Sequence, residues 1–361
     1  MAFVFAVEQN GALSSLPPPM QMFLLSEGTT LFTAVTLAAE LGIADLLANG
    51  PGSSDEIAQA TSTHPGSLYR LLRLLSVFGV FSEVEPRRFE QTPVSELLRS
   101  GTPGSMRPWM RMVGLAAWGP MFAEAMHSVK TGEPSFKRSM GVEFFDYLTT
   151  HPGDGEIFNE AMTAFGQGVV AAVVQAYDFG SAQRLVDVGG GHGALISAIL
   201  QANPHLKGTL FDLPRVAEGA RSALSAAAVA DRCEIASGDF FESVPAGGDA
   251  YVLKWIIHDW DRDRAVAILR NCRRAMNQTG RLLLIESVIA GPDEPDPGKI
   301  MDFIMLLGLG GQERTEQQYA DLLGEAGFHV TRVVRTASPM SVIEAMPTER
   351  SLVARDHGVT R

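Results

Sequence analysis

Cysteine and lysine are scarce in this sequence, and acidic residues outnumber basic ones. The two cysteines, Cys233 and Cys272, are too few for a disulfide framework in a chain of 361 residues. Basic residues number 29, of which five are lysine, against 41 acidic residues, so the net charge is −12. Because such a surface repels phosphate backbones and anionic lipid, we expect neither nucleic acid nor a membrane as a partner.

Long apolar runs, targeting signals and metal-binding patterns are also missing. No run approaches the ~20 apolar residues of a membrane-spanning helix, and residues 1–9 lack the basic start and cleavage site of a signal peptide. Residues 259–263 resemble the start of a calcium loop, but Arg264 and Arg270 stand where such a loop needs glycine and glutamate. No G-x-S-x-G motif indicates a hydrolase, and no closely spaced His, Cys and carboxylate set indicates zinc. We therefore expect a cytoplasmic globular protein without a metal site.

The first 102 residues predict an N-terminal helical domain with the outline of a winged helix. Residues 11–20 indicate a flexible or polyproline lead-in, and apolar positions from Leu24 to Leu41 then recur at helical spacing. The elements expected next are a helix capped by Ser53 or Ser54, a helix over residues 67–78 and a hairpin over residues 81–92.

This outline raises the possibility of DNA binding, which the charges of the segment oppose. Residues 51–100 hold five arginines and six acidic residues, and the helix over residues 67–78 presents leucine on most of its faces. The helix over residues 24–41 is apolar on several sides, so it needs a buried environment or a partner subunit. We therefore predict a dimerisation domain rather than a DNA-binding domain.

Two further segments complete the chain. Residues 103–180 are helical in pattern and rich in Met, Phe and Trp, which predicts a core segment that also lines an apolar pocket. Residues 181–361 alternate strands with helices, which predicts a Rossmann-like, doubly wound α/β sheet. The expected strands are residues 184–188, 208–211, 232–235, 250–255 and 281–285, with an antiparallel pair, residues 328–334 and 341–344, at the edge of the sheet. The expected helices are residues 194–201, 216–228, 262–276 and 315–327.

A glycine-rich turn follows the first of these strands. Over Asp187–Gly193 the chain passes from a buried strand into a helix, and glycines there let a ligand approach the backbone. The spacing departs from the dinucleotide pattern G-x-G-x-x-G, since Ala194 stands at its last position. A carboxylate at Asp187, two residues before the first glycine, suits a cationic, amino-acid-like ligand better than a pyrophosphate. A tight structural turn is the alternative.

Two more acidic residues stand at the ends of the next two strands. Asp212 lies about 20 residues after the glycine turn, in the region where ribose hydroxyls are held. Asp239 and Phe240 follow the third strand, where an acid and an aromatic ring suit adenine. The structural alternatives are helix capping by Asp212 and a turn with a buried Phe240. Three acids in phase at successive strand ends indicate a nucleoside-like site.

Five motifs in this order resemble one family. They are residues 187–193, residues 211–214, residues 238–241, the KWIIHDW run of residues 254–260 and the GGQERT run of residues 310–315. Together they are similar to the plant caffeate/flavonoid-type S-adenosylmethionine-dependent O-methyltransferases and to bacterial relatives that tailor polyketides and phenazines. The resemblance spans nearly the whole chain. It implies a class I methyltransferase fold, S-adenosylmethionine as cofactor and a homodimer.

The resemblance also implies roles for individual residues. His258, just past the fourth strand, would be the general base for an acceptor hydroxyl, with Glu286 at the end of the fifth strand and Glu313 orienting its ring. Asp259 is expected to support local structure. The residues that the resemblance places against the cofactor are Asp187, Gly189, Gly191, Asp212, Leu213, Asp239, Phe240, Lys254 and Trp260. Capping of a nearby helix is the alternative for His258 and for Glu313.

The acceptor is predicted to be an aromatic hydroxyl compound. Residues 305–311 are one residue shorter than the plant equivalent and lack its polar His-Asn pair, which leaves an apolar wall. This favours a large, flat polycyclic phenol over a small polar phenylpropanoid. The expected pocket residues are Asn159, Met162, Met305 and Leu309, and core packing is the alternative for Met162.

Three other functions are weighed against this one. A relative that keeps the cofactor but hydroxylates or decarboxylates its substrate would not need His258, Glu286 and Glu313 intact. A magnesium-dependent catechol-type methyltransferase would leave His258 unexplained. A non-catalytic regulator would use the winged helix on DNA, against the charge count.

Overall fold

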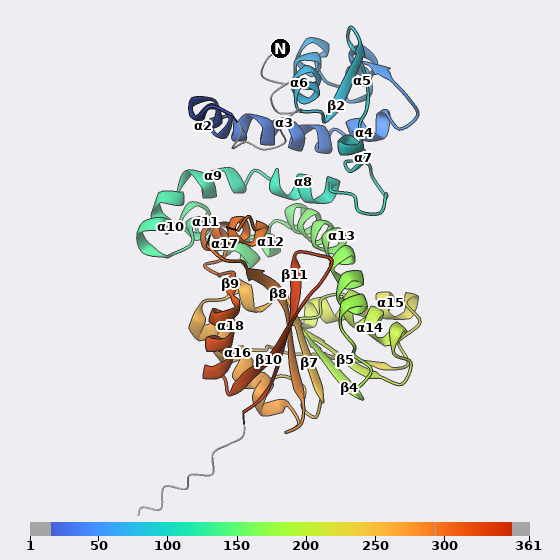
Figure 1. The fold of residues 1–361 in the computed structure, drawn as a ribbon. Helices are drawn as coiled ribbons and strands as arrows, with labels where there is room; N and C mark the ends of the chain where they lie inside the picture. The colour runs from blue at the N-terminus through green and yellow to red at the C-terminus, as the bar shows by residue number, and fades with distance from the viewer. Residues whose placement is uncertain (1–15, 293, 349–361) are drawn as a thin grey trace, which may run out of the picture. The chain divides into compact units, whose positions relative to one another are not determined.

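A computed structural model describes residues 16–292 and 294–348 of the chain, which fall into two units (Figure 1). The first unit comprises Met1–Pro120 and Phe145–Gly166, and the second comprises Met121–Phe144 and Gln167–Arg361. Both units contain helices from residues 103–180.

The first unit has the winged-helix outline. Its helices before residue 100 are α2 (Pro18–Ser26), α3 (Gly28–Glu40), α4 (Ile43–Leu46), α5 (Ser54–Ala60), α6 (Pro65–Val77) and α7 (Pro93–Glu96). Its strands β1 (Gly52–Ser53), β2 (Phe81–Glu85) and β3 (Arg88–Gln91) pair antiparallel in the order β1-β3-β2, which confirms the expected hairpin. Leu72, Leu75, Phe81 and Phe89 are fully buried between helices and sheet. Each such side chain contributes about 1.5–3 kcal/mol.

The start of this unit differs from the sequence interpretation. Helix α2 begins at Pro18, so the lead-in predicted over residues 11–20 is wrong for its last three residues; residues 11–15 lie outside the described part. Proline is tolerated there because the first helical N–H has no partner within the helix. The single apolar helix is two helices, α2 and α3, bent by 44° at Glu27.

Helix starts in this unit follow the expected side-chain chemistry. Ser53 caps α5, as predicted: its hydroxyl accepts the Glu56 backbone N–H (3.2 Å), while the Glu56 carboxylate accepts the Ser53 N–H (2.8 Å). This reciprocal capping box contributes about 1 kcal/mol. Helix α6 starts at Pro65, two residues earlier than expected, because His64 caps it by accepting from the Ser67 N–H.

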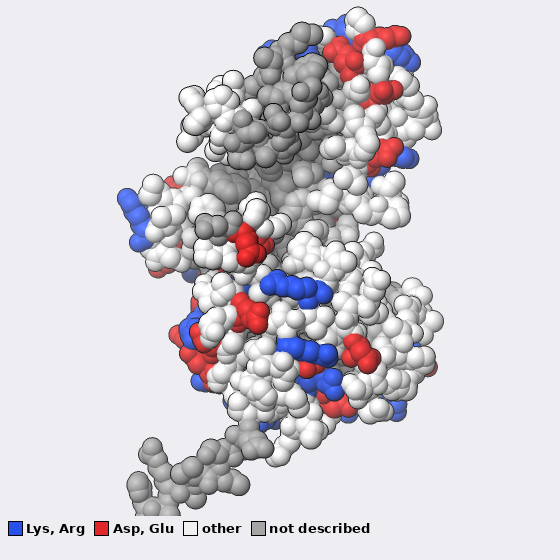
Figure 2. All heavy atoms as spheres, viewed as in Figure 1, with Lys and Arg blue, Asp and Glu red and all other residues white. Residues whose placement is uncertain are grey.

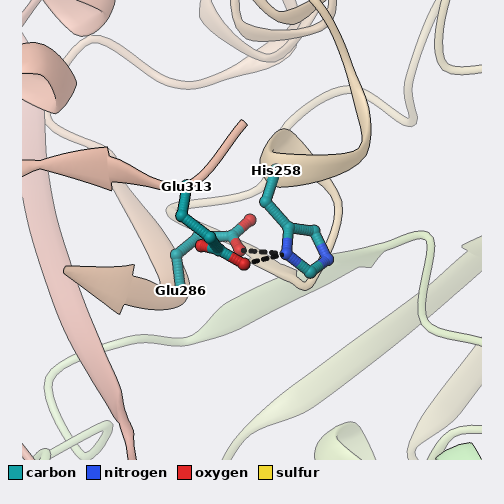
Figure 3. A group of neighbouring side chains, drawn as sticks. All are labelled: His258, Glu286 and Glu313. Atoms are coloured by element: carbon teal, nitrogen blue, oxygen red, sulfur yellow. Dashed lines mark hydrogen bonds and ion pairs between the residues drawn. The ribbon is translucent and has the colours of Figure 1, made fainter. Parts of the chain in front are cut away.

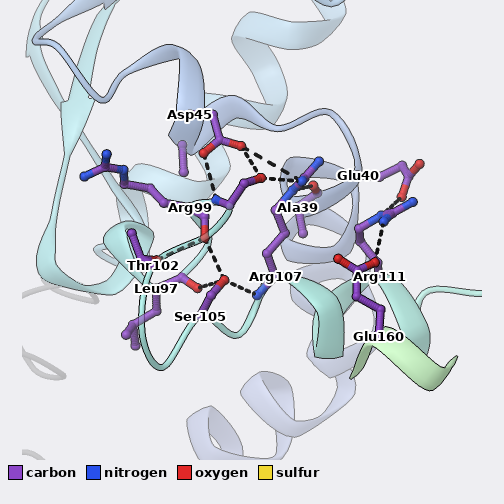
Figure 4. Close-up of polar contacts among 12 residues, drawn as sticks. Ala39, Glu40, Asp45, Leu97, Arg99, Thr102, Ser105, Arg107, Arg111 and Glu160 are labelled. Atoms are coloured by element: carbon purple, nitrogen blue, oxygen red, sulfur yellow. Dashed lines mark hydrogen bonds and ion pairs between the residues drawn. The ribbon is translucent and has the colours of Figure 1, made fainter. Parts of the chain in front are cut away.

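Two arginines join the later helices of the first unit to its earlier ones (Figure 4). Arg107 donates to the Ala39 carbonyl (2.8 Å) at the end of α3 and to the Ser100 hydroxyl (2.6 Å). Arg111 donates to Glu40 (2.8 Å) and to Glu160 (3.3 Å). These contacts hold α8 against α3 and against the first half of α13.

Residues 103–180 are mostly helical, as predicted. The helices are α8 (Arg107–Val113), α9 (Trp118–Ala123), α10 (Ala125–Thr131), α11 (Ser135–Met140), α12 (Phe144–Thr150) and α13 (Pro152–Ala176). By length and composition α13 is long and apolar enough to cross a membrane, and α2 with α3 would pass the same test as one bent span. The expectation that no stretch of the chain approaches the length and apolar character of a membrane-spanning helix is therefore wrong. The finding is weak support for a membrane span, because core helices of globular proteins pass the same test.

The second unit is a doubly wound α/β sheet, as predicted. Its strands are β4 (Arg184–Val188), β5 (Lys207–Asp212), β6 (Cys233–Ser237), β7 (Ala250–Lys254), β8 (Arg281–Ile289), β9 (Arg314–Thr315), β10 (Phe328–Arg335) and β11 (Met340–Pro347). The main order is β10-β11-β8-β7-β4-β5-β6, parallel from β8 to β6 and antiparallel for β10 and β11; β9 pairs with β8. The helices are α14 (Ala194–Ala202), α15 (Pro214–Ala226), α16 (Arg262–Ala275), α17 (Pro297–Gly308) and α18 (Glu316–Glu325), with a 3₁₀ turn, η2 (Ile257–Asp259).

Strand β8 is longer than the sequence predicts. It continues past Ile285 to Ile289 because β11 and β9 pair along its second half. Glu286 therefore lies within the strand rather than at its end, and its side chain is completely buried.

Charged side chains of both signs are mixed on the surface in view. On the face of the described chain seen in Figure 2, basic and acidic side chains lie between neutral ones. That face offers no continuous basic surface of the kind that tracks a phosphate backbone.

Candidate active site

The site lies where the strand order reverses. Strand β4 has β5 on one side and β7 on the other, so connections leave the sheet in opposite directions there and open a crevice at the carboxyl ends of the strands. The turn after β4 holds Gly189 and Gly191 at φ of 70° and 58°, values that favour glycine. At Gly189 a Cβ would also lie 2.4 Å from the Ile256 side chain. Gly189 thus lets the turn pack tightly against Ile256, whereas at Gly191, where a Cβ would meet nothing within 4 Å, the backbone is open to a ligand.

The acid predicted at the end of β5 is bound to this turn. Asp212 accepts from the Gly191 N–H (2.8 Å) and from the Leu213 N–H (2.7 Å). The carboxylate thereby joins the glycine turn to the start of α15. After β6, Asp239 accepts from the Phe241 N–H (2.8 Å) in a similar local turn.

Asp187 on β4 and Lys254 on β7 are two ionisable residues of opposite charge at this end of the sheet. Asp187 is buried, and its Oδ2 atom has no hydrogen-bond partner among the described residues. Burial raises the pKa of Asp187 to about 7, although the Lys254 charge works against the shift. Burial likewise lowers the pKa of Lys254 to about 8, and its ammonium lies 3.7 Å from the Trp255 ring centre. A buried carboxylate oxygen without a partner is costly, which makes Asp187 a candidate ligand-binding residue.

Aromatic rings gather beside this pair. Trp260 packs edge-on against Phe241 (4.9 Å between ring centres) and Phe240 (6.1 Å), and its indole N–H is buried without a partner in the described structure. Trp255, which carries the cation contact, has a φ of 55°, a conformation rare outside glycine. Strained residues of this kind cluster at functional sites.

His258 lies on η2, and two buried glutamates, Glu286 and Glu313, lie beside its ring (Figure 3). A third carboxylate, that of Asp259, also lies close to the imidazole. Its Nδ1 is 2.7 Å from Glu313 Oε1 and 4.0 Å from Glu286 Oε2, and its Nε2 is 3.3 Å from Asp259 Oδ1. The two glutamates are almost completely buried. The structure therefore brings together residues that are up to 55 positions apart in the sequence.

These contacts shift the pKa values of His258, Asp259 and Glu286. Burial by itself lowers the pKa of His258, but the charges of Asp259, Glu286 and Glu313 outweigh it and raise that pKa to about 10. Burial raises the pKa of Glu286 to about 7 and that of Asp259 to about 6, with the His258 charge opposing both shifts.

Helix capping, the alternative role considered for His258 and for Glu313, is wrong for both residues. Helix α16 is capped by Asp261 rather than His258, and α18 is capped by Thr315 rather than Glu313. Glu286 has one oxygen engaged by the backbone, because its Oε1 accepts from the N–H groups of Ile256 (3.1 Å) and Ile257 (2.8 Å). Its other oxygen faces the histidine.

Comparison with known proteins agrees with this geometry. The sequence pattern of the O-methyltransferase domain matches residues 122–329, and that of the O-methyltransferase dimerisation domain matches residues 23–101. The phenazine O-methyltransferase PhzM of Lysobacter antibioticus is 43% identical over 342 residues, 94% of this chain and 99% of that protein. The crystal structure of LaPhzM superposes with a TM-score of 0.86 at 44% identity, over 92% of this chain and 100% of that chain.

This chain belongs to the O-methyltransferase family. It is an S-adenosylmethionine-dependent enzyme with a Rossmann-like catalytic fold, and the match to the dimerisation domain supports the expected homodimer. NcsB1, an O-methyltransferase from neocarzinostatin biosynthesis, was crystallised with S-adenosylmethionine and 2-hydroxy-5-methyl naphthoic acid. It is 34% identical, with a TM-score of 0.77 over 88% of this chain and 96% of that chain.

One relative is named for a different reaction. Aclacinomycin 10-hydroxylase RdmB of Streptomyces purpurascens is 34% identical over 300 residues, 82% of this chain and 80% of that protein. Its identity is lower than that of PhzM, so methyl transfer is the better supported reaction for this enzyme.

The residues in the crevice fit S-adenosylmethionine. The glycine turn leaves the backbone open at Gly191, and the Asp187 oxygen without a partner in the described structure suits a cationic amino group. The Phe240 and Trp260 rings suit adenine, and Asp212 has the chemistry to bind ribose hydroxyls. These side chains all come from the second unit.

The enzyme also contains two site residues to which the sequence interpretation gives no role. Asp302 on α17 accepts the backbone N–H of Glu313 (2.9 Å), and Arg314 donates to backbone carbonyls on both sides of His258. Arg314 lies inside the GGQERT motif, next to Glu313, so the motif could have indicated a role for this residue. Asp302 lies in an apolar helix, where a single acid is the only hint.

The expected pocket residues belong to different units. Asn159 and Met162 lie on α13 in the first unit, and Met305 on α17 and Leu309 after it lie in the second. Met162, Met305 and Leu309 are partly buried, and Asn159 is exposed.

A divalent cation is geometrically possible at the histidine cluster. His258, Glu286 and Glu313 offer ligand atoms that all lie within 4.8 Å of one another. The 2.7 Å contact between His258 and Glu313 is, however, already a hydrogen bond that uses the Nδ1 atom.

Proposed function

We propose that this enzyme methylates a phenolic hydroxyl of a polycyclic aromatic compound, with His258 as the general base. The observation that carries the proposal is the hydrogen bond from His258 Nδ1 to Glu313. A carboxylate at Nδ1 keeps the proton of a neutral imidazole on that nitrogen, so Nε2 is the atom available to accept another.

The base is suited to a phenol. A free phenol has a pKa of about 10, so little phenolate forms at neutral pH without help. The cluster raises the pKa of His258 to about 10, which makes proton transfer from a phenol nearly balanced in energy. Binding of a positive charge in the glycine-turn crevice would lower this pKa and free Nε2, because like charges destabilise each other.

The cofactor is proposed to be held by Asp187, Gly189, Gly191, Asp212, Leu213, Asp239, Phe240, Lys254 and Trp260. S-adenosylmethionine supplies a methyl group activated by its sulfonium. The chain supplies position: Asp187 and Asp212 hold the polar parts, while Phe240 and Trp260 exclude water from the apolar part. Correct positioning of the reacting groups accounts for much of the rate in such displacements.

The acceptor class is inferred from the apolar end of α17 and from relatives. Residues 305–311 offer no charged side chain to bind a small polar acid. PhzM is named for a phenazine, and NcsB1 was crystallised with a naphthoic acid, which are both flat polycycles. We propose that Asn159, Met162, Met305 and Leu309 contact the acceptor.

Two further proposals concern the whole chain. The domain limits are residues 1–102, 103–180 and 181–361, and the enzyme is cytoplasmic.

The test is a methyl-transfer screen over hydroxyphenazines and hydroxynaphthalenes with wild type and two variants. His258→Ala is expected to lower kcat by about 10²–10⁴-fold while calorimetry still shows S-adenosylmethionine binding. Asp212→Ala is expected to weaken that binding. A His258→Ala variant with full activity would overturn the base assignment and favour the hydroxylase-like alternative. Activity lost with EDTA and restored by Mg²⁺ would instead show that the cluster binds a metal.

A further inference from the structure

Arg314 is a buried cation with an unusual set of partners. It is 3% exposed, and none of the ion pairs in the described part of the chain involves it. Its guanidinium instead donates to three backbone carbonyls, those of Ile257 (3.1 Å), Gln312 (2.9 Å) and Trp260 (3.0 Å). A buried charge is costly unless its donors are satisfied, and here backbone oxygens satisfy them.

Two of these carbonyls lie on either side of His258, at the ends of the η2 segment that we call the catalytic turn. Ile257 precedes His258, and Trp260 follows it by two residues, so one guanidinium joins both ends of η2. The Gln312 N–H donates to the His258 carbonyl (2.8 Å), and a Cβ on Gly311 would lie 2.0 Å from that same oxygen. Glu313 accepts the hydrogen bond of the imidazole, so residues 311 to 314 meet the turn at three kinds of atom. Gly311 and Gln312 lie against the His258 carbonyl, Glu313 against its ring, and Arg314 against the carbonyls on either side.

We propose that Arg314 is a positioning residue for methyl transfer, which fixes the His258 turn in register with Glu313. The proposal rests on the proposed role of His258. Glu313 and Arg314 are adjacent in the sequence, so a shift of residues 311–314 would displace the Glu313 carboxylate and the Arg314 guanidinium together. Arginine suits the task because its planar fork reaches three acceptors at once, whereas lysine offers one nitrogen at the end of a flexible stem.

The chain contains a matched control for this brace. Arg232, in the same unit, donates to three backbone carbonyls, those of Leu200, Asn203 and Leu206. It braces the loop before β5, and none of these partners belongs to the His258 cluster. Arg232→Lys therefore removes an equivalent structural brace while leaving the catalytic turn intact.

The experiment compares Arg314→Lys with Arg232→Lys. In Arg314→Lys, kcat for a hydroxyphenazine is expected to fall by about 10–100-fold, with little change in KM, because the base is misplaced. Rates are normalised to S-adenosylmethionine-binding sites from calorimetry, so that misfolded molecules do not count. Arg232→Lys is expected to lower the melting temperature but to leave the normalised kcat within about twofold of wild type.

A second readout does not depend on turnover. In the protein without cofactor, NMR of ¹⁵N-labelled histidine follows the His258 imidazole, assigned by its loss in His258→Ala. Arg314→Lys is expected to lower the pKa of His258 and weaken the signature of its hydrogen bond to Glu313; Arg232→Lys is expected to do neither. An unchanged titration together with wild-type kcat in Arg314→Lys would overturn the proposal.

The double variant His258→Ala/Arg314→Lys separates this inference from the proposed function. If Arg314 acts through His258, the double variant is no slower than His258→Ala alone. If His258→Ala is itself fully active, the base assignment fails whatever Arg314 does. A slow His258→Ala combined with a normal Arg314→Lys would refute the brace and leave the base intact.

Discussion

At the level of single residues, the group that lies beside Nε2 of His258 affects the pH at which the imidazole can act as a base. Asp259 Oδ1 lies 3.3 Å from Nε2, the atom that must accept a proton from the substrate. Its charge also helps to raise the pKa of the imidazole. Asp259, expected only to support local structure, therefore adjusts the pH at which the base becomes available.

Asp259→Asn is expected to move the pH dependence of the reaction. The substitution removes a negative charge that stabilises the imidazolium, so the pKa of His258 falls. Because a general base acts when deprotonated, the rising acidic limb of kcat against pH should shift to lower pH, by about one unit. Asp261→Asn, which alters the cap of α16 two residues away, is the control and should leave the limb in place. A shift to higher pH would contradict the argument.

At the level of secondary structure, the segment before β9 fits against η2 so closely that it tolerates no side chain at Gly311. A methyl group added at this position would lie 2.0 Å from the His258 carbonyl oxygen. That oxygen also accepts the Gln312 N–H, so the contact cannot relax without losing a hydrogen bond. Glycine is needed here for close approach rather than for an unusual φ.

Gly311→Ala is expected to displace the turn that carries His258. We expect kcat to fall by about 10²-fold, since small misplacements of a catalytic group have effects of this size, and stability to fall by about 1–3 kcal/mol. Steady-state kinetics and denaturant unfolding measure the two effects. Gly324→Ala on α18, where a Cβ meets nothing within 4 Å, should keep full activity and gain up to about 1 kcal/mol. Normal kcat in Gly311→Ala would show that the turn can shift freely.

At the level of the whole molecule, the exposed apolar residues of the first unit are explained by a second copy of the chain. Met22, Phe23 and Leu25 on α2 are more than half exposed, and Phe32 and Leu37 on α3 are also exposed. The dimerisation-domain match covers residues 23–101, which includes most of this surface. Exposed clusters of large apolar side chains mark such interfaces.

Replacing Leu25 and Phe32 together by glutamate is expected to produce monomers. Two buried charges would oppose association by several kcal/mol. Sedimentation at micromolar concentration should then show a monomer, whereas wild type is expected to sediment as a dimer. Val84→Glu, on the exposed part of β2, is the matched control and should remain dimeric. A dimeric double variant would place the interface on another surface.

Local sequence was enough to predict many elements. The strand Arg184–Val188, the cap at Ser53 and the hairpin of β2 and β3 depend on neighbouring residues, whose periodicity and turn chemistry can be seen directly. The start of α2 at Pro18 and the extension of β8 to Ile289 were missed. Pairing with β9 and β11 sets the end of β8, and those partners lie far along the chain.

The family, the glycine turn and the residue types of the site can all be predicted from the sequence, because the order and spacing of the motifs can be seen along the chain. The contacts of His258 become visible only in the folded chain: Glu313 binds its Nδ1, Asp259 lies beside its Nε2, and Arg314 donates to the turn that carries it. The contact between His258 and Glu313 joins segments 55 positions apart. It forms because the sheet brings the loop after β7 beside β9, a juxtaposition that no local pattern encodes.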